Sequence, residues 1–284
     1  MTLFQLSLVI IKLMLKKYNF IFILIFFFSN WIRADEINFF KKIRGCFCTG
    51  GLIVGKVDRS DKIVIDGKSI KISEDGFFVF GFGRNYQNSV NFNVNGQKYT
   101  RNIEKKKYKV ERINNLPKRK VEPSKDDLDQ IIKDQKKIKL AKKNSINRKI
   151  FSNKFRLPVE GRISGVYGSQ RILNKIPKRP HYGLDIAAPK GKKIFAPNNG
   201  VVTMSAKNMF FTGNTVILDH GLGLISIFAH LEDIFVEVGE AVEVGKLIAS
   251  VGMTGRATGP HLHWGMYLSN IPIDPMLVVE ANLF

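Results

Sequence analysis

Apolar and polar positions follow three successive patterns along the chain. From residue 50 to residue 114, short β-prone runs alternate with polar turn dipeptides. The segment that follows, to residue 154, is rich in lysine, and its apolar residues recur at helical spacing. From residue 155 onward, strand-length apolar runs are separated by glycine and proline. Because short apolar runs between turn signals are typical of strands, we predict an all-β protein with one helical segment.

The first β region is predicted to be a small domain over residues 35–114. Its β-prone runs are Ile63–Ile65, Ile70–Ile72, Phe77–Phe80, Val90–Val94 and Lys98–Ile103. The dipeptides Asp66-Gly67, Asp75-Gly76 and Asn95-Gly96 separate them and favour hairpin turns. Several strands of this length suggest an immunoglobulin-like sandwich. The region contains no histidine, so we expect it to bind or to act as a spacer rather than to catalyse.

Residues 115–154 are predicted to form a basic helical linker. Pro117 and Pro123 interrupt regular structure ahead of Ser124, which is a favourable N-cap residue. Acidic residues follow in the next turn, where they stabilise the positive end of the helix dipole. The apolar stripe of this helix is narrow. We therefore expect a connector that lies against one domain rather than a core helix.

The second β region is predicted to be a larger antiparallel domain over residues 155–284. Its expected strands are Val201–Ser205, Thr215–Asp219, Leu224–Ala229, Ala241–Val244, Lys246–Gly252 and His261–Leu268. No long helical pattern interrupts them. Every group of residues that could perform chemistry lies in this region.

The first 34 residues have the pattern of a secretory signal peptide, which predicts a periplasmic or cell-envelope protein. Two lysines precede the apolar run 20–28, and Ala34 offers a small residue for cleavage. The apolar run is too short to span a bilayer by itself. An earlier apolar stretch in residues 1–13 is explained by translation from Met14 or by an uncleaved membrane anchor, and the sequence leaves both open.

The chain is strongly basic. It has 284 residues, with 45 Lys and Arg against 24 Asp and Glu, and a net charge of +21. Residues 101–150 alone contain 18 basic and 7 acidic residues. Such an excess fits anionic surroundings or a polyanionic partner. Because no nucleic-acid-binding motif accompanies it, we expect a solvated linker and no nucleic acid partner. The oligomeric state is not indicated.

The two cysteines, Cys46 and Cys48, are separated by a single residue. If this stretch were a strand, the two Cβ atoms would point along nearly parallel vectors, and a disulfide would be strained. Two thiolates alone are also a poor metal site. The sequence therefore assigns these cysteines no role.

Four of the five histidines fall into three short motifs. His181 and Asp185 are four residues apart, a spacing that returns both to one face of a strand or helix. His261 and His263 are two residues apart in an apolar stretch typical of a strand, so we expect their side chains on the same face. His230 lies between the two pairs in the sequence. Histidines and an aspartate around an open fourth position are a typical catalytic zinc site.

In this order, the motifs resemble the zinc endopeptidases of the lysostaphin and LytM type, peptidase family M23, which cut peptide cross-links in peptidoglycan. The resemblance covers residues 157–275. Its motifs are His-Tyr-Gly-Leu-Asp, Phe-Ala-His-Leu and Gly-Pro-His-Leu-His-Trp. It implies that residues 155–284 form an antiparallel LytM-type sheet with a groove across it.

The resemblance also implies a role for each motif residue. The metal ligands would be His181, Asp185 and His263, and they would hold one Zn²⁺ per chain. The catalytic residues would be His230 and His261, which would take the proton from the attacking water or stabilise the oxyanion. The division of these two duties is left open, and His220 is given no catalytic role.

The main functional hypothesis is a secreted zinc endopeptidase that binds peptidoglycan stem peptides and hydrolyses their cross-links. We favour direct D-alanyl-diaminopimelate cross-links as its substrate. The alternative is a catalytically silent regulator that activates other cell-wall hydrolases. Retention of all five motif residues favours the enzyme. A third hypothesis, an envelope adhesion or scaffold role of the N-terminal region and the basic linker, is compatible with the enzyme.

Overall fold

A computed structural model describes residues 38–115, 118–152 and 154–283. The predicted signal peptide, residues 1–34, lies outside the described residues. Residues 44–284 form one compact unit, which contains every described element after the first strand. In the described part of the chain, no helix combines the length and the apolar character that crossing a membrane requires.

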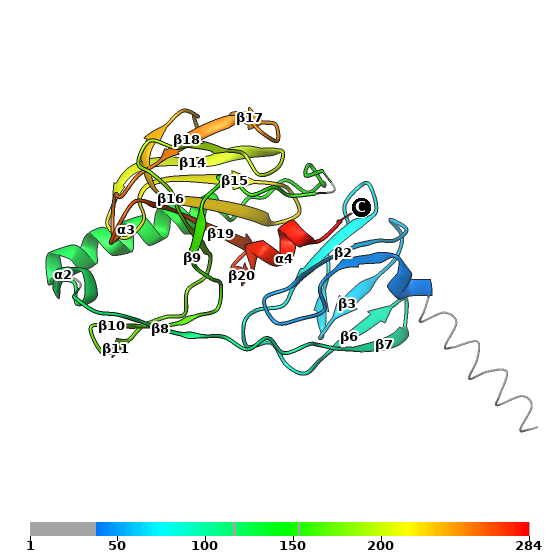
Figure 1. Ribbon diagram of the computed structural model, residues 1–284. Coiled ribbons are helices and arrows are strands. Elements are labelled where there is room, and N and C mark those ends of the chain that lie inside the picture. Colours follow the sequence, from blue (N-terminus) through cyan, green and yellow to red (C-terminus); the bar gives the residue numbers. More distant parts are fainter. Residues whose placement is uncertain (1–37, 116–117, 153, 284) are drawn as a thin grey trace, which may run out of the picture. The chain divides into compact units, whose positions relative to one another are not determined.

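The largest sheet among the described residues has ten strands, and all its pairings are antiparallel. Its strands are β9 (Arg162–Gly165), β12 (Leu184–Ala187), β13 (Lys193–Phe195), β14 (Gly200–Met209), β15 (Gly213–Asp219), β16 (Leu224–Ile234), β17 (Ala241–Val242), β18 (Leu247–Val251), β19 (His261–Leu268) and β20 (Ile271–Ile273). The order through the centre is β14-β15-β16-β19-β12-β9 (Figure 1). The predicted antiparallel fold of this region is confirmed.

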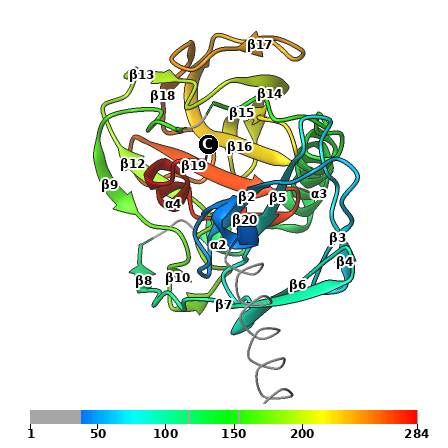
Figure 2. The ribbon, with the colours of Figure 1, turned by 90° about the vertical axis from the view of Figure 1, so that its right-hand side faces the viewer.

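Side chains along β19 alternate between the hydrophobic core and the opposite face of the sheet. Leu262 and Trp264 are fully buried on one face of the strand and join the main hydrophobic core. His261 and His263 lie on the opposite face and stay partly exposed. The prediction that the two histidines share a face is therefore confirmed. The adjacent strands β16 and β19 cross the middle of the sheet (Figure 2).

The linker contains two helices, α2 (Lys118–Val121) and α3 (Lys125–Ala141). Ser124 caps α3 as predicted, and it forms a capping box with Asp127. Ile138 packs on a second apolar cluster formed by β14, β15 and β16. Asp134 is buried and accepts a hydrogen bond from the backbone of Phe210, 2.7 Å away. The helix therefore lies against the large sheet.

The N-terminal β region contains short strands in two small sheets, followed by β8, which pairs outside this region. Its elements are β1 (Ile43–Gly45), β2 (Leu52–Lys56), β3 (Ile63–Ile65), β4 (Lys68–Ser69), β5 (Phe77–Gly81), β6 (Ser89–Val94), β7 (Gln97–Asn102) and β8 (Val110–Ile113). The predicted Asp66-Gly67 and Asn95-Gly96 turns are confirmed, with positive φ at all four residues. The predicted strand at Ile70–Ile72 is wrong, because the short turn fixes the pairing of β3 with β4 and the ladder ends at Ser69.

One face of the β2–β5 pair belongs to the main core of the large sheet. Leu52, Val54 and Val79 lie in the same hydrophobic cluster as Trp264. Gly81 approaches so closely that a Cβ there would lie 2.7 Å from a methyl group of Ile273. Apolar packing therefore continues across the boundary predicted at residue 155, and the division of the chain into domains at this residue stays a prediction.

Two further features of the segment between residues 44 and 177 were not expected from the sequence. Cys46 and Cys48 form a disulfide with their Cα atoms 5.3 Å apart. The residues after Gly45 leave regular strand geometry, so the alternation argument against this bond did not apply. In addition, β8 pairs in parallel with β10 (Gln170–Leu173), which also pairs with β11 (Ile176–Pro177).

Candidate active site

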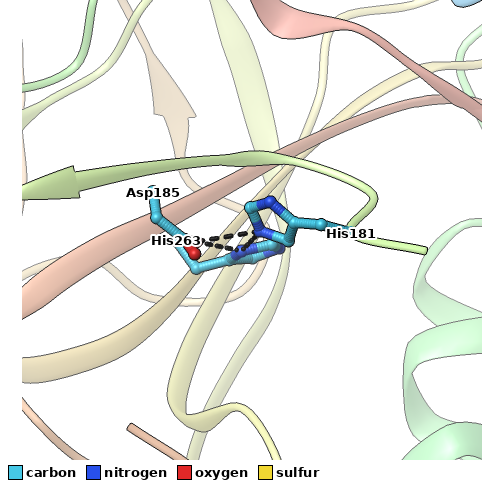
Figure 3. A group of neighbouring side chains, drawn as sticks. All are labelled: His181, Asp185 and His263. Atoms are coloured by element: carbon cyan, nitrogen blue, oxygen red, sulfur yellow. Dashed lines mark hydrogen bonds and ion pairs between the residues drawn. The ribbon is translucent and has the colours of Figure 1, made fainter. Parts of the chain in front are cut away.

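Three predicted ligands meet where β12 lies beside β19. Asp185 on β12 is paired directly with His263 on β19, so the two side chains project from the same face of the sheet. His181 lies three residues before β12 and turns its ring toward both (Figure 3). Figure 3 shows the three side chains pointing toward one another.

The three ligand atoms form a compact triangle. Asp185 Oδ1 lies 2.7 Å from His263 Nδ1 and 3.0 Å from His181 Nε2. The two histidine nitrogens are 3.0 Å apart. Metal bonds of about 2.0–2.1 Å in a tetrahedral site place ligand atoms roughly 3.3 Å apart. The two nitrogens and one oxygen therefore fit a zinc ion after shifts of a few tenths of an ångström.

Hydrogen bonds select the ring nitrogen that each ligand would offer. His181 Nδ1 lies 3.1 Å from the carbonyl oxygen of Val166, and only a protonated Nδ1 can donate to that oxygen. This tautomer leaves the lone pair on Nε2, the atom that faces the cluster. Such an outer partner is common for a metal-binding histidine. His263 presents Nδ1 instead.

Two glycines make room for the cluster. A Cβ on Gly183 would lie 2.6 Å from the His263 ring, and one on Gly165 would lie 2.7 Å from Asp185 Oδ2. Neither contact occurs in real structures without displacement of a neighbour. Close approach of the backbone to the ligands therefore requires glycine at both positions.

The carboxylate of Asp185 stays ionised. Burial alone would raise its pKa, but the hydrogen bonds and positive charge that His181 and His263 supply when their rings are protonated lower the pKa well below the ordinary value. The anion is therefore present at every physiological pH. An ionised carboxylate and neutral imidazoles are the forms that bind a metal.

His230 reaches the same site through an irregularity in β16. Ala229 pairs with His263 and Phe228 pairs with Trp264, so strict alternation would send His230 to the core face. The register of β16 instead shifts near this point, and His230 has a left-handed φ of 63°. Such bulges re-aim side chains next to active sites. The ring of His230 lies 6.1 Å from that of His263.

His261 completes the histidine cluster. Its Nε2 lies 3.9 Å from Asp185 Oδ1, too far for a hydrogen bond, and its ring centroid lies 4.7 Å from that of His230. Burial, with the charge of neighbouring His261 and His263, lowers the pKa of His230 to about 3. All five residues singled out from the sequence therefore meet in one place, and their individual roles stay predictions.

Cationic side chains surround the cluster. A cavity of about 330 Å³ beside Asp185 and His261 is lined by Arg162, Arg171 and Arg256. A second cavity of about 490 Å³ beside His181 and His263 is lined by Arg171, Lys178, Arg179 and Arg256. Among the described residues that line the second cavity there is no carboxylate. Thr258 also lines the first cavity.

Two residues at the site were missed by the sequence analysis. Arg171 on β10 donates to Asp185 Oδ2, and Glu111 on β8 forms an ion pair with Arg171. Both stand in short β-prone stretches without a recognisable motif. Their proximity to Asp185 arises from pairing between distant strands, for which the sequence has no local signal.

His220 lies outside the site. It is fully buried, with Nδ1 2.6 Å from the carbonyl oxygen of Asn199 and Nε2 2.8 Å from Ser226 Oγ. Ser226 Oγ in turn accepts a hydrogen bond from the indole of Trp264, over 3.2 Å. This network supports the strand that carries His263.

Comparison with known proteins agrees with this geometry. Residues 179–275 match the sequence profile of Peptidase family M23. Peptidoglycan DD-endopeptidase ShyA of Vibrio cholerae is 38% identical over 132 residues, which are 45% of this chain and 30% of that protein. DD-carboxypeptidase/endopeptidase Mpg of Neisseria meningitidis is 38% identical over 100 residues, 35% of this chain and 23% of that protein. The chain thus spans less than a third of the length of these curated relatives.

A solved structure extends the likeness beyond the matched region. The crystal structure of a protein assigned to peptidase M23 from Pseudomonas aeruginosa is 28% identical to this chain, with a TM-score of 0.62. The similarity covers 84% of this chain and 96% of that one. His181, Asp185, His230, His261 and His263 all lie within the segment that matches the family profile. Residues 179–275 therefore form a domain of the peptidase family M23 type.

Proposed function

We propose that this chain is a zinc-dependent endopeptidase that hydrolyses peptide cross-links of peptidoglycan. The observation that carries the proposal is the convergence of His181, Asp185 and His263, whose ligand atoms all lie within 4.8 Å of one another. The relatives that share this domain are named peptidoglycan DD-endopeptidases, which supports the same substrate. Their action on peptidoglycan also supports a place in the periplasm or cell envelope.

The chain's own residues divide the work. His181, Asp185 and His263 would hold one zinc ion. When bound, zinc lowers the pKa of water from 15.7 to about 7 and polarises a carbonyl group. Near it, His230 and His261 each keep one ring nitrogen available to the groove, because Nδ1 of each is bonded to a backbone carbonyl. A neutral imidazole there accepts the proton of the attacking water, and an imidazolium donates it to the leaving amine.

The charge of the groove favours an acidic peptide. Five cations line the two cavities, namely Arg162, Arg171, Lys178, Arg179 and Arg256. The carboxylates among the described lining residues are Glu111 and Asp185. Cross-links that carry free carboxylates offer anions that these cations can bind, whereas bridges made only of glycine carry no side-chain carboxylate. This excess of positive charge supports D-alanyl-diaminopimelate cross-links.

The proposal is tested by incubation of the purified chain with wall sacculi and analysis of the released muropeptides by mass spectrometry. We expect cross-linked dimers to be converted to monomers, and a chelator to stop the conversion. His263→Ala is the matched inactive control. If the chain releases nothing by itself but accelerates another wall hydrolase, the alternative of a catalytically silent regulator replaces the enzyme.

A further inference from the structure

Strand β8 brings a carboxylate to the edge of the candidate metal centre. Glu111 on β8 and Arg171 on β10 are direct partners in a parallel strand pair. Arg171 Nε lies 3.5 Å from Glu111 Oε2, and both side chains are about three-quarters buried. Arg171 Nε is buried without a hydrogen bond among the described residues, so Glu111 supplies charge compensation rather than a hydrogen bond. Glu111 lies 68 residues before the segment that matches the family profile.

The same arginine also contacts a candidate ligand. Arg171 Nη2 donates to Asp185 Oδ2, with 2.5 Å between the two atoms. The other oxygen, Asp185 Oδ1, faces His181 and His263. The two oxygens of one carboxylate therefore have separate partners, an arginine on one side and the metal-binding nitrogens on the other.

Gly165 keeps this arrangement sterically possible. It is the strand partner of Asp185 on β9, and a Cβ at this position would lie 2.7 Å from Asp185 Oδ2. The bare backbone thus leaves space for Oδ2 to turn toward Arg171. The orientation of the carboxylate is determined by three strands, β9, β10 and β12.

We propose that Glu111 and Arg171 are a positioning pair, which holds Asp185 so that only Oδ1 is offered to the metal. The pair rests on the proposed zinc site. A free carboxylate can rotate and bind a metal through one oxygen or both, and this freedom is lost when a guanidinium engages Oδ2. Outer partners of this kind typically contribute ~10–100-fold to metal affinity or activity. Glu111 does not contact Asp185 in this arrangement, and it acts by holding the flexible side chain of Arg171 in place.

The test compares zinc affinity in variants of the full chain, by competition with a chromophoric chelator. Arg171→Met keeps an unbranched apolar stem and removes every donor. We expect its zinc affinity to fall by ~10–100-fold. Arg171→Lys retains one charged donor group without the planar guanidinium, and we expect an intermediate loss of zinc affinity. Arg162→Gln is the control, because it removes one charge from the same cavity and has no contact with Asp185 among the described interactions. Its zinc affinity should equal that of the natural chain.

A double-variant cycle tests whether Glu111 acts through Arg171. Glu111→Gln alone should weaken zinc binding roughly two- to fivefold, the range of a partly exposed ion pair. In the Arg171→Met background, Glu111→Gln should leave the zinc affinity unchanged, because the arginine through which Glu111 would influence Asp185 is absent. If Glu111→Gln weakens zinc binding equally in the natural chain and in Arg171→Met, Glu111 does not act through Arg171.

Other outcomes separate this inference from the proposed function. If the natural chain binds no zinc, the proposed function is refuted, and the positioning role that rests on it is refuted with it. If the natural chain binds zinc and Arg171→Met keeps its affinity, or gains affinity, the positioning role is refuted. A raised KM with unchanged zinc affinity in Arg171→Met would identify a substrate-binding residue instead, and would equally overturn the proposal.

Discussion

The rings of His230 and His261 lie with their centroids 4.7 Å apart, and each turns Nδ1 toward a backbone carbonyl. His230 Nδ1 is 2.8 Å from the oxygen of Thr254, and His261 Nδ1 is 2.8 Å from the oxygen of Gly259. Because a carbonyl only accepts, both Nδ1 atoms must carry hydrogen. In the neutral rings the lone pair is therefore on Nε2, which suits proton transfer rather than structural support.

The first prediction follows from this pair. His230→Ala and His261→Ala should each bind one zinc ion, since His181, Asp185 and His263 remain. Each should still lose ~10²–10⁴-fold in cross-link hydrolysis, the usual contribution of a general acid or base. Zinc content by atomic absorption and muropeptide release, measured on the same preparations, check both statements.

The second prediction concerns the neighbouring histidine. His263→Ala removes one of three ligands, so the purified variant should be largely free of zinc and inactive. A metal-free His261→Ala together with a zinc-bound His263→Ala would reverse the assignment of the two residues. Full activity in both variants would contradict the enzyme hypothesis.

The sequence predicted the β19 face of the site because a single strand obeys simple alternation. His261 and His263 needed only to be two residues apart in an apolar strand. The strands β14, β15 and β16 were predicted for the same reason, as strand-length apolar runs between turn residues. Local patterns are sufficient where one element determines the geometry.

The rest of the site depends on departures from local pattern and on distant pairing. His230 would face the core under strict alternation, and the bulge in β16 with its positive φ redirects it. The contact between Glu111 and Arg171 arises from parallel pairing of strands 60 residues apart. The Cys46–Cys48 disulfide likewise depends on chain geometry outside a regular strand. Neither composition nor periodicity encodes such features.

The third prediction concerns stability against pH. Burial lowers the pKa of His220 to about 4, despite opposing contributions from the Asn199 carbonyl and the charge of Asp219. In the unfolded chain the pKa returns to its ordinary value of about 6.5. Between these values the unfolded state binds a proton that the folded state does not. The free energy of unfolding should therefore be unaffected by His220 above pH 6.5, and should fall by about 3 kcal/mol between pH 6.5 and 4.

Urea unfolding of the metal-free chain at pH 7 and pH 4.5 measures this loss. Burial also lowers the pKa of His230 and of His263, and both add to the loss, so the comparison is with His220→Gln. This variant should be less stable at pH 7, because it loses part of the network with Ser226. Its further loss on acidification should be about 2 to 3 kcal/mol smaller than that of the natural chain. Equal losses would show that His220 is not the titrating group.

The fourth prediction concerns the attachment of α3. Asp134→Ala removes the acceptor of the Phe210 backbone N–H, which is 2.7 Å away. An unsatisfied buried donor costs about 1–3 kcal/mol, and the free energy of unfolding should fall by that amount. Asp129→Ala, at an exposed position of the same helix, is the control and should change stability little. If both variants have the same stability, the helix is a solvated connector in solution.

The last prediction tests the space around the ligands. At Gly183, a Cβ would lie 2.6 Å from the ring of His263 and 2.8 Å from the carbonyl oxygen of Trp264. The backbone of β19 cannot move away without disturbing the sheet, so the His263 ring must shift. Gly183→Ala should therefore fold and yet bind zinc about tenfold or more weakly, in the range that displaced metal partners cost. Gly83→Ala is the matched control, since its Cβ would meet nothing closer than 3.6 Å. Undiminished zinc affinity in Gly183→Ala, measured beside this control, would mean that His263 is not a ligand or that its ring has room that the structure does not contain.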